Sequence, residues 1–471
     1  MTNDEFRKRA HELVDWIGDY LDEIEDYPVK SQVKPGEIYS ALPVLPPLEG
    51  EDFEEIFRDF REIIMPGISH WQSPDFFAYF PANNSAPSIL AEMLTAALGA
   101  QCMIWETSPA AAELEERVMN WLRDIIGLPA HFEGVIQDTA STSTLASFIA
   151  ARERISAFRT NEKGLSGEPV YRVYASTQTH SSIEKAVKIA GFGVKNLVKV
   201  GVRDDLSMDP GQLAEAISKD LEEGYLPCCT VATIGTTGTM AIDPLKEIGE
   251  ICKKHNIWLH VDAAMAGTAL LLPEYSWMIE GKEHIDSFVF NPHKWMFTNF
   301  DCSAYFIRDA DGLIKTFEIL PEYLKTRTRG EVNDYRDWGI PLGRRFRALK
   351  LWFVIRSFGL EGLRERIRDH LSYASWLAER IREHGEFEIT APPVLNTVCF
   401  RYKAGRKDDK SLNEINEKLM HKLNDSGEIY LTHTRINGSY SLRMVIGQTN
   451  VRLENIKKAW ELICATALSI Q

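Results

Sequence analysis

The sequence FVFNPHKWMFTNFDCSAYF (residues 288–306) contains one lysine, Lys294, between two apolar runs that are typical of β-strands. A lysine that loses part of its hydration has a lower pKa, so its neutral amine becomes available as a nucleophile. A lysine can also extend its ammonium group out of an apolar segment into water, and this segment alone favours that simpler interpretation. The rest of the chain decides between the two.

Strand-like runs alternate with helical patterns on the N-terminal side of this segment. Apolar runs cover residues 170–176, 196–202, 228–235, 257–264 and 285–290, and helical patterns cover residues 181–190, 209–224 and 245–256. Several runs are continuously apolar, which is typical of strands that are buried on both faces. The sequence therefore predicts an α/β fold with a mostly parallel central sheet covered on both faces. In such sheets, ligands bind beyond the carboxyl ends of the strands.

The chain is too long for one compact core, and three parts are expected. Residues 1–85 contain an amphipathic helix, a proline-bearing linker and a second helical pattern. Residues 86–347 form the large α/β domain, and residues 348–471 form a small α+β domain. The first part has little core of its own, so we expect it to pack on something else, such as another subunit.

The composition argues against several classes of function. A formal net charge of -15 without a long basic run does not suit binding to nucleic acid or to anionic lipid. No apolar stretch has the length of a membrane span, and the first residues lack the apolar core of a signal peptide. The seven cysteines are scattered without a CxxC pair, which predicts a reduced, cytoplasmic protein without a metal site.

Hydroxyl groups follow two of the predicted strands. In GVIQDTASTSTL (134–145), a short apolar strand leads into a Ser/Thr cluster and then into a helix. Helix capping explains one of these hydroxyls, whereas a helix N-terminus with several hydroxyls beside it is typical of an anion site. Thr236 and Thr237 offer two further hydroxyls after the run at 228–235.

Three ionisable residues follow other strands. Asp262 closes the run IWLHVD, and a carboxylate at the end of a buried strand needs a cationic or donor partner. The small residues after it would leave space for a flat group. His180 begins a helix after the run at 170–176, where a histidine alone is more often a capping residue. Lys294 follows the run at 285–290, with His293 beside it.

These groups fit one ligand well, which is pyridoxal phosphate (PLP). This cofactor requires a lysine for a Schiff base, a carboxylate that keeps the pyridine nitrogen protonated, and a flat group that stacks on the ring. Its phosphate requires an anion site. The sequence therefore predicts PLP as the cofactor.

The chain resembles the group II PLP-dependent decarboxylases of the aromatic L-amino acid decarboxylase family, which share the fold type I scaffold. The resemblance runs nearly from end to end. The motifs that carry it are HWQSPDFFAYFPA (70–82), GVIQDTAST (134–142), THSSIEKA (179–186), HVDAAMAG (260–267), NPHKWMFTNFDCSAYF (291–306), LPEYLK (320–325) and PLGRRFRALKLWF (341–353).

The resemblance implies a homodimer with its active sites at the interface. It also implies that Lys294 forms the Schiff base, that Asp262 pairs with the pyridinium, and that His180 stacks on the ring and orients the substrate carboxylate. The other cofactor-binding residues that it implies are Ala140, Ser141, Thr237, Ala264, Asn291 and His293.

A catalytic role for Tyr323, in LPEYLK, is implied in the same way. A phenol on a mobile loop can return a proton to the substrate after CO2 has left, and the polar residues that follow are typical of a closing lid. Relatives with phenylalanine at this position form an aldehyde by oxidation. Because Tyr323 and His180 are both present, the resemblance implies an amine product, with an aromatic acetaldehyde synthase as the alternative.

The implied substrate pocket is aromatic, although an aromatic cluster can equally be core. Its residues are Trp71, Tyr79, Phe80, Pro81, Ala82, Met103, His180 and Gly343. Ala82 stands where relatives that act on catechols often have threonine, and Gly343 stands where serine accompanies phenolic substrates in some relatives. The space at Gly343 favours an indole, so tryptophan is expected as a substrate alongside phenylalanine or tyrosine.

Two other classes remain open from the sequence. One is another fold type I enzyme, either an aminotransferase, which would need an arginine clamp and no loop phenol, or a glutamate-type decarboxylase. The latter would need cationic contacts in place of Trp71 and Phe80. The other class is a non-enzymatic binding protein, which would be expected to lack Lys294 or Asp262, and both are present.

Overall fold

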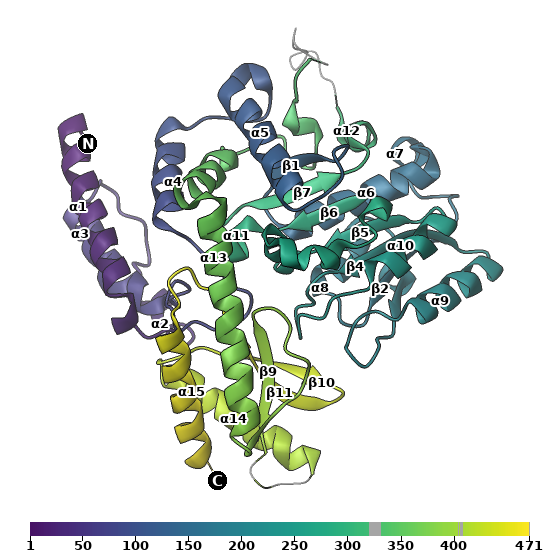
Figure 1. Cartoon of the computed structure of the whole chain (residues 1–471). Helices are drawn as coiled ribbons and strands as arrows, with labels where there is room; N and C mark the ends of the chain where they lie inside the picture. Colours follow the sequence, from purple (N-terminus) through teal and green to yellow (C-terminus); the bar gives the residue numbers. More distant parts are fainter. Residues whose placement is uncertain (320–330, 404, 406–407, 471) are drawn as a thin grey trace. The chain divides into compact units, whose positions relative to one another are not determined.

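In the computed structural model, which describes residues 1–319, 331–403, 405 and 408–470, seven strands form the larger sheet. Their order is β1-β7-β6-β5-β4-β2-β3. The strands from β2 to β6 pair in parallel, and β7 is antiparallel to both β1 and β6. The predicted mostly parallel sheet is therefore confirmed (Figure 1). The strands are β1 (Glu133–Gln137), β2 (Tyr171–Ser176), β3 (Leu197–Val200), β4 (Leu226–Thr233), β5 (Trp258–Asp262), β6 (Ser287–Phe290) and β7 (Ser303–Ile307).

Helices cover this sheet on both faces (Figure 1). Helix α6 packs on α8 and along β1 and β4 to β7, while α9 and α10 pack on each other and on β4. Strands β5 and β6 are buried along their whole length, which explains why their sequences are continuously apolar. The helices are α4 (Ala86–Leu98), α5 (Pro109–Ile125), α6 (Ala140–Ser156), α7 (Arg159–Lys163), α8 (Ser181–Ile189), α9 (Pro210–Glu222), α10 (Leu245–Lys254), α11 (Pro292–Trp295) and α12 (Ala310–Phe317).

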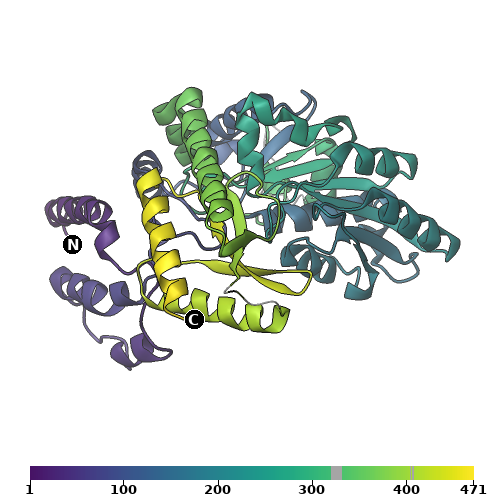
Figure 2. The same ribbon diagram turned by 60° about the horizontal axis from the view of Figure 1, so that its bottom comes forward.

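A four-stranded sheet forms from the C-terminal residues, in the order β10-β11-β9-β8 (Figure 2). Helix α14 packs on α15 and on β11. The elements are β8 (Phe387–Ile389), β9 (Thr397–Tyr402), α14 (Asp409–Asp425), β10 (Thr432–Ile436), β11 (Ser439–Val445) and α15 (Leu453–Leu468). The N-terminal residues form α1 (Asn3–Asp22), α2 (Glu37–Ala41) and α3 (Phe53–Asp59).

The chain divides into two compact units. The first comprises Met1–Pro81, Ser375–Thr390 and Cys399–Gln471, and the second comprises Ala82–Ala374 and Ala391–Val398. Helix α13 (Arg347–Glu383) contributes to both, and Gly359 interrupts it with a φ of 66°, which glycine adopts without strain. The predicted division into three parts, at 1–85, 86–347 and 348–471, stays a prediction.

Three general features bear on function. The seven cysteines are free thiols; Cys464 is half-buried and the other six are buried. Among the described helices, none combines the length and the apolar character that crossing a bilayer requires. The described residues also contain no cluster of three or more His, Cys, Asp or Glu side chains arranged to hold a metal ion.

Gly267 marks a close approach between the segment after β5 and strand β6. A Cβ atom at this position would lie 2.4 Å from the Cβ of Phe290 and 3.2 Å from the Cβ of Ala263. The Gly267 N–H also donates to the Ala263 carbonyl over 2.8 Å. Small residues are therefore required here for packing between protein segments.

Replacing Gly267 with alanine should destabilise the fold because the added methyl group has no space beside Phe290. We expect a loss of about 1–3 kcal/mol in the free energy of unfolding, measured by urea denaturation. The control is Gly18→Ala in α1, where an added Cβ meets nothing within 4 Å. That variant should be as stable as the wild type or more stable by up to about 1 kcal/mol. Wild-type stability of Gly267→Ala would contradict the packing argument.

Candidate active site

The carboxyl ends of three neighbouring strands lie together at one edge of the larger sheet. The register pairs Thr233 of β4 with Asp262 of β5, and Asp262 with Val289 of β6. Directly beyond the strands, the Asn291 N–H donates to the Ala264 carbonyl over 3.0 Å. The segment that follows β6 is therefore held beside the end of β5.

Lys294 lies in the short helix α11 and is half-buried. Its N–H donates to the Asn291 carbonyl over 2.9 Å, and the Asn83 side-chain amide donates to the Lys294 carbonyl over 2.5 Å. The Asn83 N–H also donates to the His293 carbonyl over 3.1 Å. Asn83 was not among the predicted site residues, and its signal is the pair of adjacent amides in PANNSAP (81–87). The backbone that carries the lysine is thus fixed from two directions.

Asp262 is the last residue of β5 and is 5% exposed. Its Oδ1 accepts a hydrogen bond from the Ala264 N–H over 3.1 Å. A buried carboxylate gains from a cationic partner, because one neutral hydrogen bond offsets only part of its lost hydration. A protonated ring nitrogen would supply that charge.

The small residues after Asp262 do not all leave space for a ligand. Ala263 and Met265 are fully buried, and Gly267 is packed against β6 as described above. Ala264 is the half-buried member of this group. The expected space for a flat group therefore reduces to the surroundings of Ala264.

His180 is the N-cap of α8, directly after the turn that follows β2. Its Nδ1 accepts from the Ser182 N–H over 3.2 Å, which leaves Nε2 to carry the proton of a neutral ring. Burial lowers the pKa of His180, the charge of Asp262 raises it, and the charge of Lys294 lowers it. Strands β2, β4, β5 and β6 pair in parallel, so His180, Asp262 and Lys294 lie at strand ends along one edge of the sheet. The ring itself is accessible to solvent.

The N-terminus of α6 follows β1, and Thr139 caps it by accepting from the Thr142 N–H over 3.4 Å. Deeper in the helix, the Ser143 hydroxyl donates to the Thr139 carbonyl, and Thr144 lies against a buried histidine. Ser141 is exposed at the start of the helix. The first-turn N–H groups of Ala140 and Ser141 have no acceptor within a helix, so they could bind a phosphate.

The two threonines after β4 differ. The Thr236 hydroxyl is buried and accepts from the Ala241 N–H over 3.0 Å, so it closes a turn. Thr237 is exposed. Of the two predicted hydroxyls, Thr237 is therefore the one that a ligand can reach.

Asn291 and His293 are buried and anchored to the start of β7. The Ser303 hydroxyl donates to Asn291 Oδ1 over 2.7 Å, and the Cys302 N–H donates to His293 Nδ1 over 2.9 Å. Burial lowers the pKa of His293 to about 3, and the charge of Lys294 acts in the same direction. The neutral ring therefore carries its proton on Nε2 and can donate from there.

Four of the predicted substrate-binding residues belong to the first unit. The Trp71 ring stacks on that of Tyr79 with a centroid separation of 5.7 Å, and Pro81 is buried. Arg443 of β11 donates from Nη1 to the Tyr79 carbonyl over 2.8 Å, and its guanidinium lies 4.7 Å from the centre of the Phe80 ring.

Arg443 was not predicted, although an arginine inside the apolar run SLRMVI (441–446) is a visible signal. It is 3% exposed, and its Nε and Nη2 have no hydrogen-bond partner. Burial lowers the pKa of Arg443 to about 10. A buried guanidinium with free donors is suited to an anionic group such as a carboxylate.

The other predicted substrate-binding residues belong to the second unit. Ala82 precedes Asn83 and is thus near the lysine-bearing turn. Met103 and Gly343 lie in two segments that pair with each other, because the Arg336 N–H donates to the Met103 carbonyl and the Cys102 N–H donates to the Arg344 carbonyl. Main-chain bonds therefore fix the backbone around these two positions.

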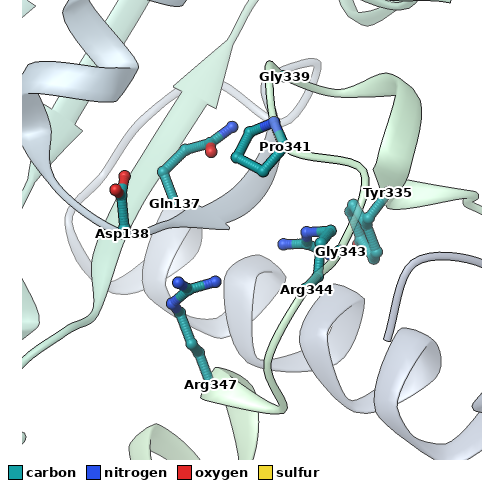
Figure 3. A pocket seen from close by; sticks show the side chains of 8 residues that line it. All are labelled: Gln137, Asp138, Tyr335, Gly339, Pro341, Gly343, Arg344 and Arg347. Atoms are coloured by element: carbon teal, nitrogen blue, oxygen red, sulfur yellow. The ribbon is translucent and has the colours of Figure 1, made fainter. Parts of the chain in front are cut away.

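A cavity of about 50 Å³ lies beside Gly343 (Figure 3). Its lining residues are Gln137, Asp138, Tyr335, Gly339, Pro341, Gly343, Arg344 and Arg347. Two of its cations are already paired, Arg344 with Glu115 and Arg347 with Asp301. The cavity has room for a few water molecules, and its polar lining suits them.

The residues around Lys294 fit PLP. An amine, a buried carboxylate, an accessible imidazole and a helix N-terminus all follow strands that end at the same edge of the sheet. Tyr323 lies outside the described residues, so its position relative to this group stays a prediction.

Comparison with known proteins agrees with this interpretation of the site. The model of the pyridoxal-dependent decarboxylase conserved domain matches residues 35–403. The chain is 40% identical to tyrosine decarboxylase 3 of Petroselinum crispum, over 98% of this chain and 91% of that protein. It is 41% identical to phenylacetaldehyde synthase of Arabidopsis thaliana, over 98% and 96%. The crystal structure of Oryza sativa TDC with PLP and tryptamine superposes with a TM-score of 0.97 at 36% identity, covering 100% of this chain and 99% of that one.

Proposed function

The chain belongs to the family of pyridoxal-dependent decarboxylases, and from that premise we propose that it converts an aromatic L-amino acid into the corresponding arylalkylamine and CO2. The observation that carries the proposal is the grouping of Lys294, Asp262 and His180 at the carboxyl ends of β6, β5 and β2, at one edge of the sheet. The names of the relatives support an aromatic substrate, because they include a tyrosine decarboxylase and a tryptamine-bound structure.

The cofactor supplies an electron sink for cleavage of a bond at the substrate's α-carbon. In our proposal, Lys294 holds its aldehyde end, and Asp262 keeps a proton on its ring nitrogen. The neutral His180 ring covers the face of the cofactor and orients the substrate carboxylate. The N-terminus of α6 at Ala140 and Ser141 holds the phosphate end of the cofactor. The remaining contacts to the cofactor come from Thr237, Ala264, Asn291 and His293.

Tyr323 decides the product in this proposal. Its phenol would deliver a proton to the substrate's α-carbon after CO2 has left, and this protonation would complete the amine. The similarity to a phenylacetaldehyde synthase makes oxidative formation of an aldehyde the second candidate. Tyrosine at 323 together with His180 favours the amine.

Tryptophan is the substrate that we favour, with phenylalanine or tyrosine also accepted. A Cβ atom at Gly343 would lie 3.2 Å from the Gln101 amide nitrogen, so Gln101 fills the space beside this glycine, and the preference for an indole rests on the resemblance. The rings of Trp71, Tyr79 and Phe80 offer flat apolar surfaces, which support an aromatic side chain. Arg443 beside Phe80 is a cation of the kind that a glutamate side chain would need, so the assay with L-glutamate given below decides between the two substrate classes.

We also propose that the chain works as a homodimer in the cytoplasm. Helix α4 leaves Leu90, Met93, Leu94 and Leu98 between 41% and 63% exposed. These residues recur at helical spacing and form one apolar stripe, which favours coverage by a partner surface. The N-terminal segment also exposes Val44, Leu45 and Leu48.

Lys294→Ala should abolish the covalent attachment of PLP. The wild-type protein should show a visible absorbance band that borohydride removes, and the variant should lack this band and lose activity by about 10³-fold or more. The control is Lys246→Ala, which removes an exposed lysine. The specificity is measured as amine formation from L-tryptophan, L-phenylalanine, L-tyrosine and L-glutamate. Amine from glutamate alone would overturn the aromatic assignment.

Tyr323→Phe should move the product from amine toward aldehyde because, without the acidic phenol proton, dissolved O2 can oxidise the substrate after CO2 has left and is itself reduced to peroxide. Aldehyde and peroxide, measured beside amine and CO2 with the same substrate, give the partition. If the wild-type protein already formed mainly aldehyde and peroxide, the second candidate function would replace the first.

Leu94→Glu should weaken self-association because it places a charge in the apolar stripe of α4. Light scattering should report a two-chain mass for the wild type and a lower mass for the variant at equal concentration. Leu221→Glu is the matched control, since Leu221 is 44% exposed on α9. A one-chain mass for the wild-type protein would contradict the dimer.

A further inference from the structure

A buried polar network lies one layer beneath the candidate site. Its centre is His260, a fully buried residue of β5 that precedes Asp262 by two positions. Alternate residues of a strand point to the same face, so the two side chains lie on one side of the sheet. The partners of His260 are Thr144 and Ser147 of α6 and Ser287 of β6, all of them buried.

Both ring nitrogens of His260 have a hydroxyl partner. Trp258 Nε1 can only donate, and it lies 2.8 Å from the Ser287 hydroxyl, which must therefore accept. The same hydroxyl lies 2.9 Å from His260 Nδ1, and the Thr144 hydroxyl lies 3.1 Å from Nε2. Because a hydroxyl can donate or accept, both contacts form in either neutral tautomer of the ring. The ring thus links two other elements through opposite nitrogens.

Burial agrees with this neutral form, because it lowers the pKa of His260 to about 4. Ser147 adds a further link, since its hydroxyl lies 3.2 Å from His260 Nδ1 and 2.9 Å from the Tyr305 hydroxyl of β7. A buried polar network of this kind is rigid only when each of its polar groups has a hydrogen-bond partner.

Each element tied by this ring carries part of the candidate site. Thr144 lies about one helical turn beyond Ala140, where α6 would hold the phosphate. Ser287 begins β6, the strand that leads to Asn291 and the lysine-bearing turn. The strand of His260 itself ends in Asp262. The spacing between the phosphate end and the ring-nitrogen end of the site depends on how α6 sits against β5.

We propose that His260 is a positioning residue that sets the separation between the N-terminus of α6 and Asp262. This proposal rests on the proposed function, because it assumes that PLP spans these two groups. PLP is rigid, so a shift of α6 relative to β5 would weaken its phosphate contacts or displace its ring nitrogen from Asp262. A purely structural role would instead affect stability alone.

The sharpest test removes or retains the hydroxyl at position 144 and leaves His260 in place. Thr144→Val removes the hydroxyl that bonds to Nε2 at nearly constant volume, and Thr144→Ser keeps it. His260→Leu removes the whole link, and Ile248→Ala, a buried change in α10, is the stability control. The dissociation constant for PLP, the visible spectrum of the holoenzyme and its thermal unfolding are measured for each full-length variant.

We expect Thr144→Val and His260→Leu to bind PLP about 10-fold to 100-fold more weakly and to show an altered visible spectrum. Thr144→Ser should bind as the wild type does, and Ile248→Ala should lose thermal stability without a change in affinity. If Thr144→Val folds and His260→Leu does not, the former alone decides the question.

PLP affinity within twofold of the wild type in Thr144→Val, with an unchanged spectrum, would overturn the positioning role. These readouts need no substrate, so they remain decisive if the wild-type holoenzyme binds PLP but forms no aromatic amine, which would overturn only the proposed function. Failure of the wild-type chain to bind PLP would overturn both.

Discussion

Main-chain pairing of β4, β5 and β6 is the constraint on which the candidate site depends. Hydrogen bonds between these strands, and one further bond from Asn291 to Ala264 beyond them, bring the lysine-bearing turn beside Asp262. Each proposed cofactor-binding residue follows the end of a strand of this sheet. Side chains add to this arrangement chiefly by anchoring the turns, as Asn83 does at Lys294.

Burial also determines where charge resides in the site. It lowers the pKa of His180 and His293 at the strand ends and of His260 beneath them. These rings therefore act as neutral hydrogen-bonding or stacking groups. Lys294 supplies an amine and Asp262 a carboxylate at the strand ends, which are the two groups that a cofactor with an aldehyde and a ring nitrogen requires.

Much of the sheet and part of the site could be predicted from the sequence. Strands such as β5 and β6 are visible because burial on both faces makes them continuously apolar, and polar residues that end such runs stand out for the same reason. The proposed roles of Ala140, Thr237 and Tyr323 rest on family resemblance, since neither spacing nor polarity distinguishes a ligand contact from a cap or a turn. Other features depend on partners far away in the chain: Asn83 binds a carbonyl 211 positions later, and the Thr144–His260 contact spans 116 positions. A sequence pattern reports that a residue is small or buried, but it does not report what it faces.

The cysteine beside the lysine-bearing turn has a chemical consequence. Aldehydes react with thiolates as well as with amines, and Cys302 donates its backbone N–H to the histidine adjoining Lys294. Complete burial raises the pKa of the Cys302 thiol to about 12, so it stays protonated and poorly nucleophilic. Selectivity for nitrogen over sulfur is thereby built into the surroundings of the lysine, without removal of the competing side chain.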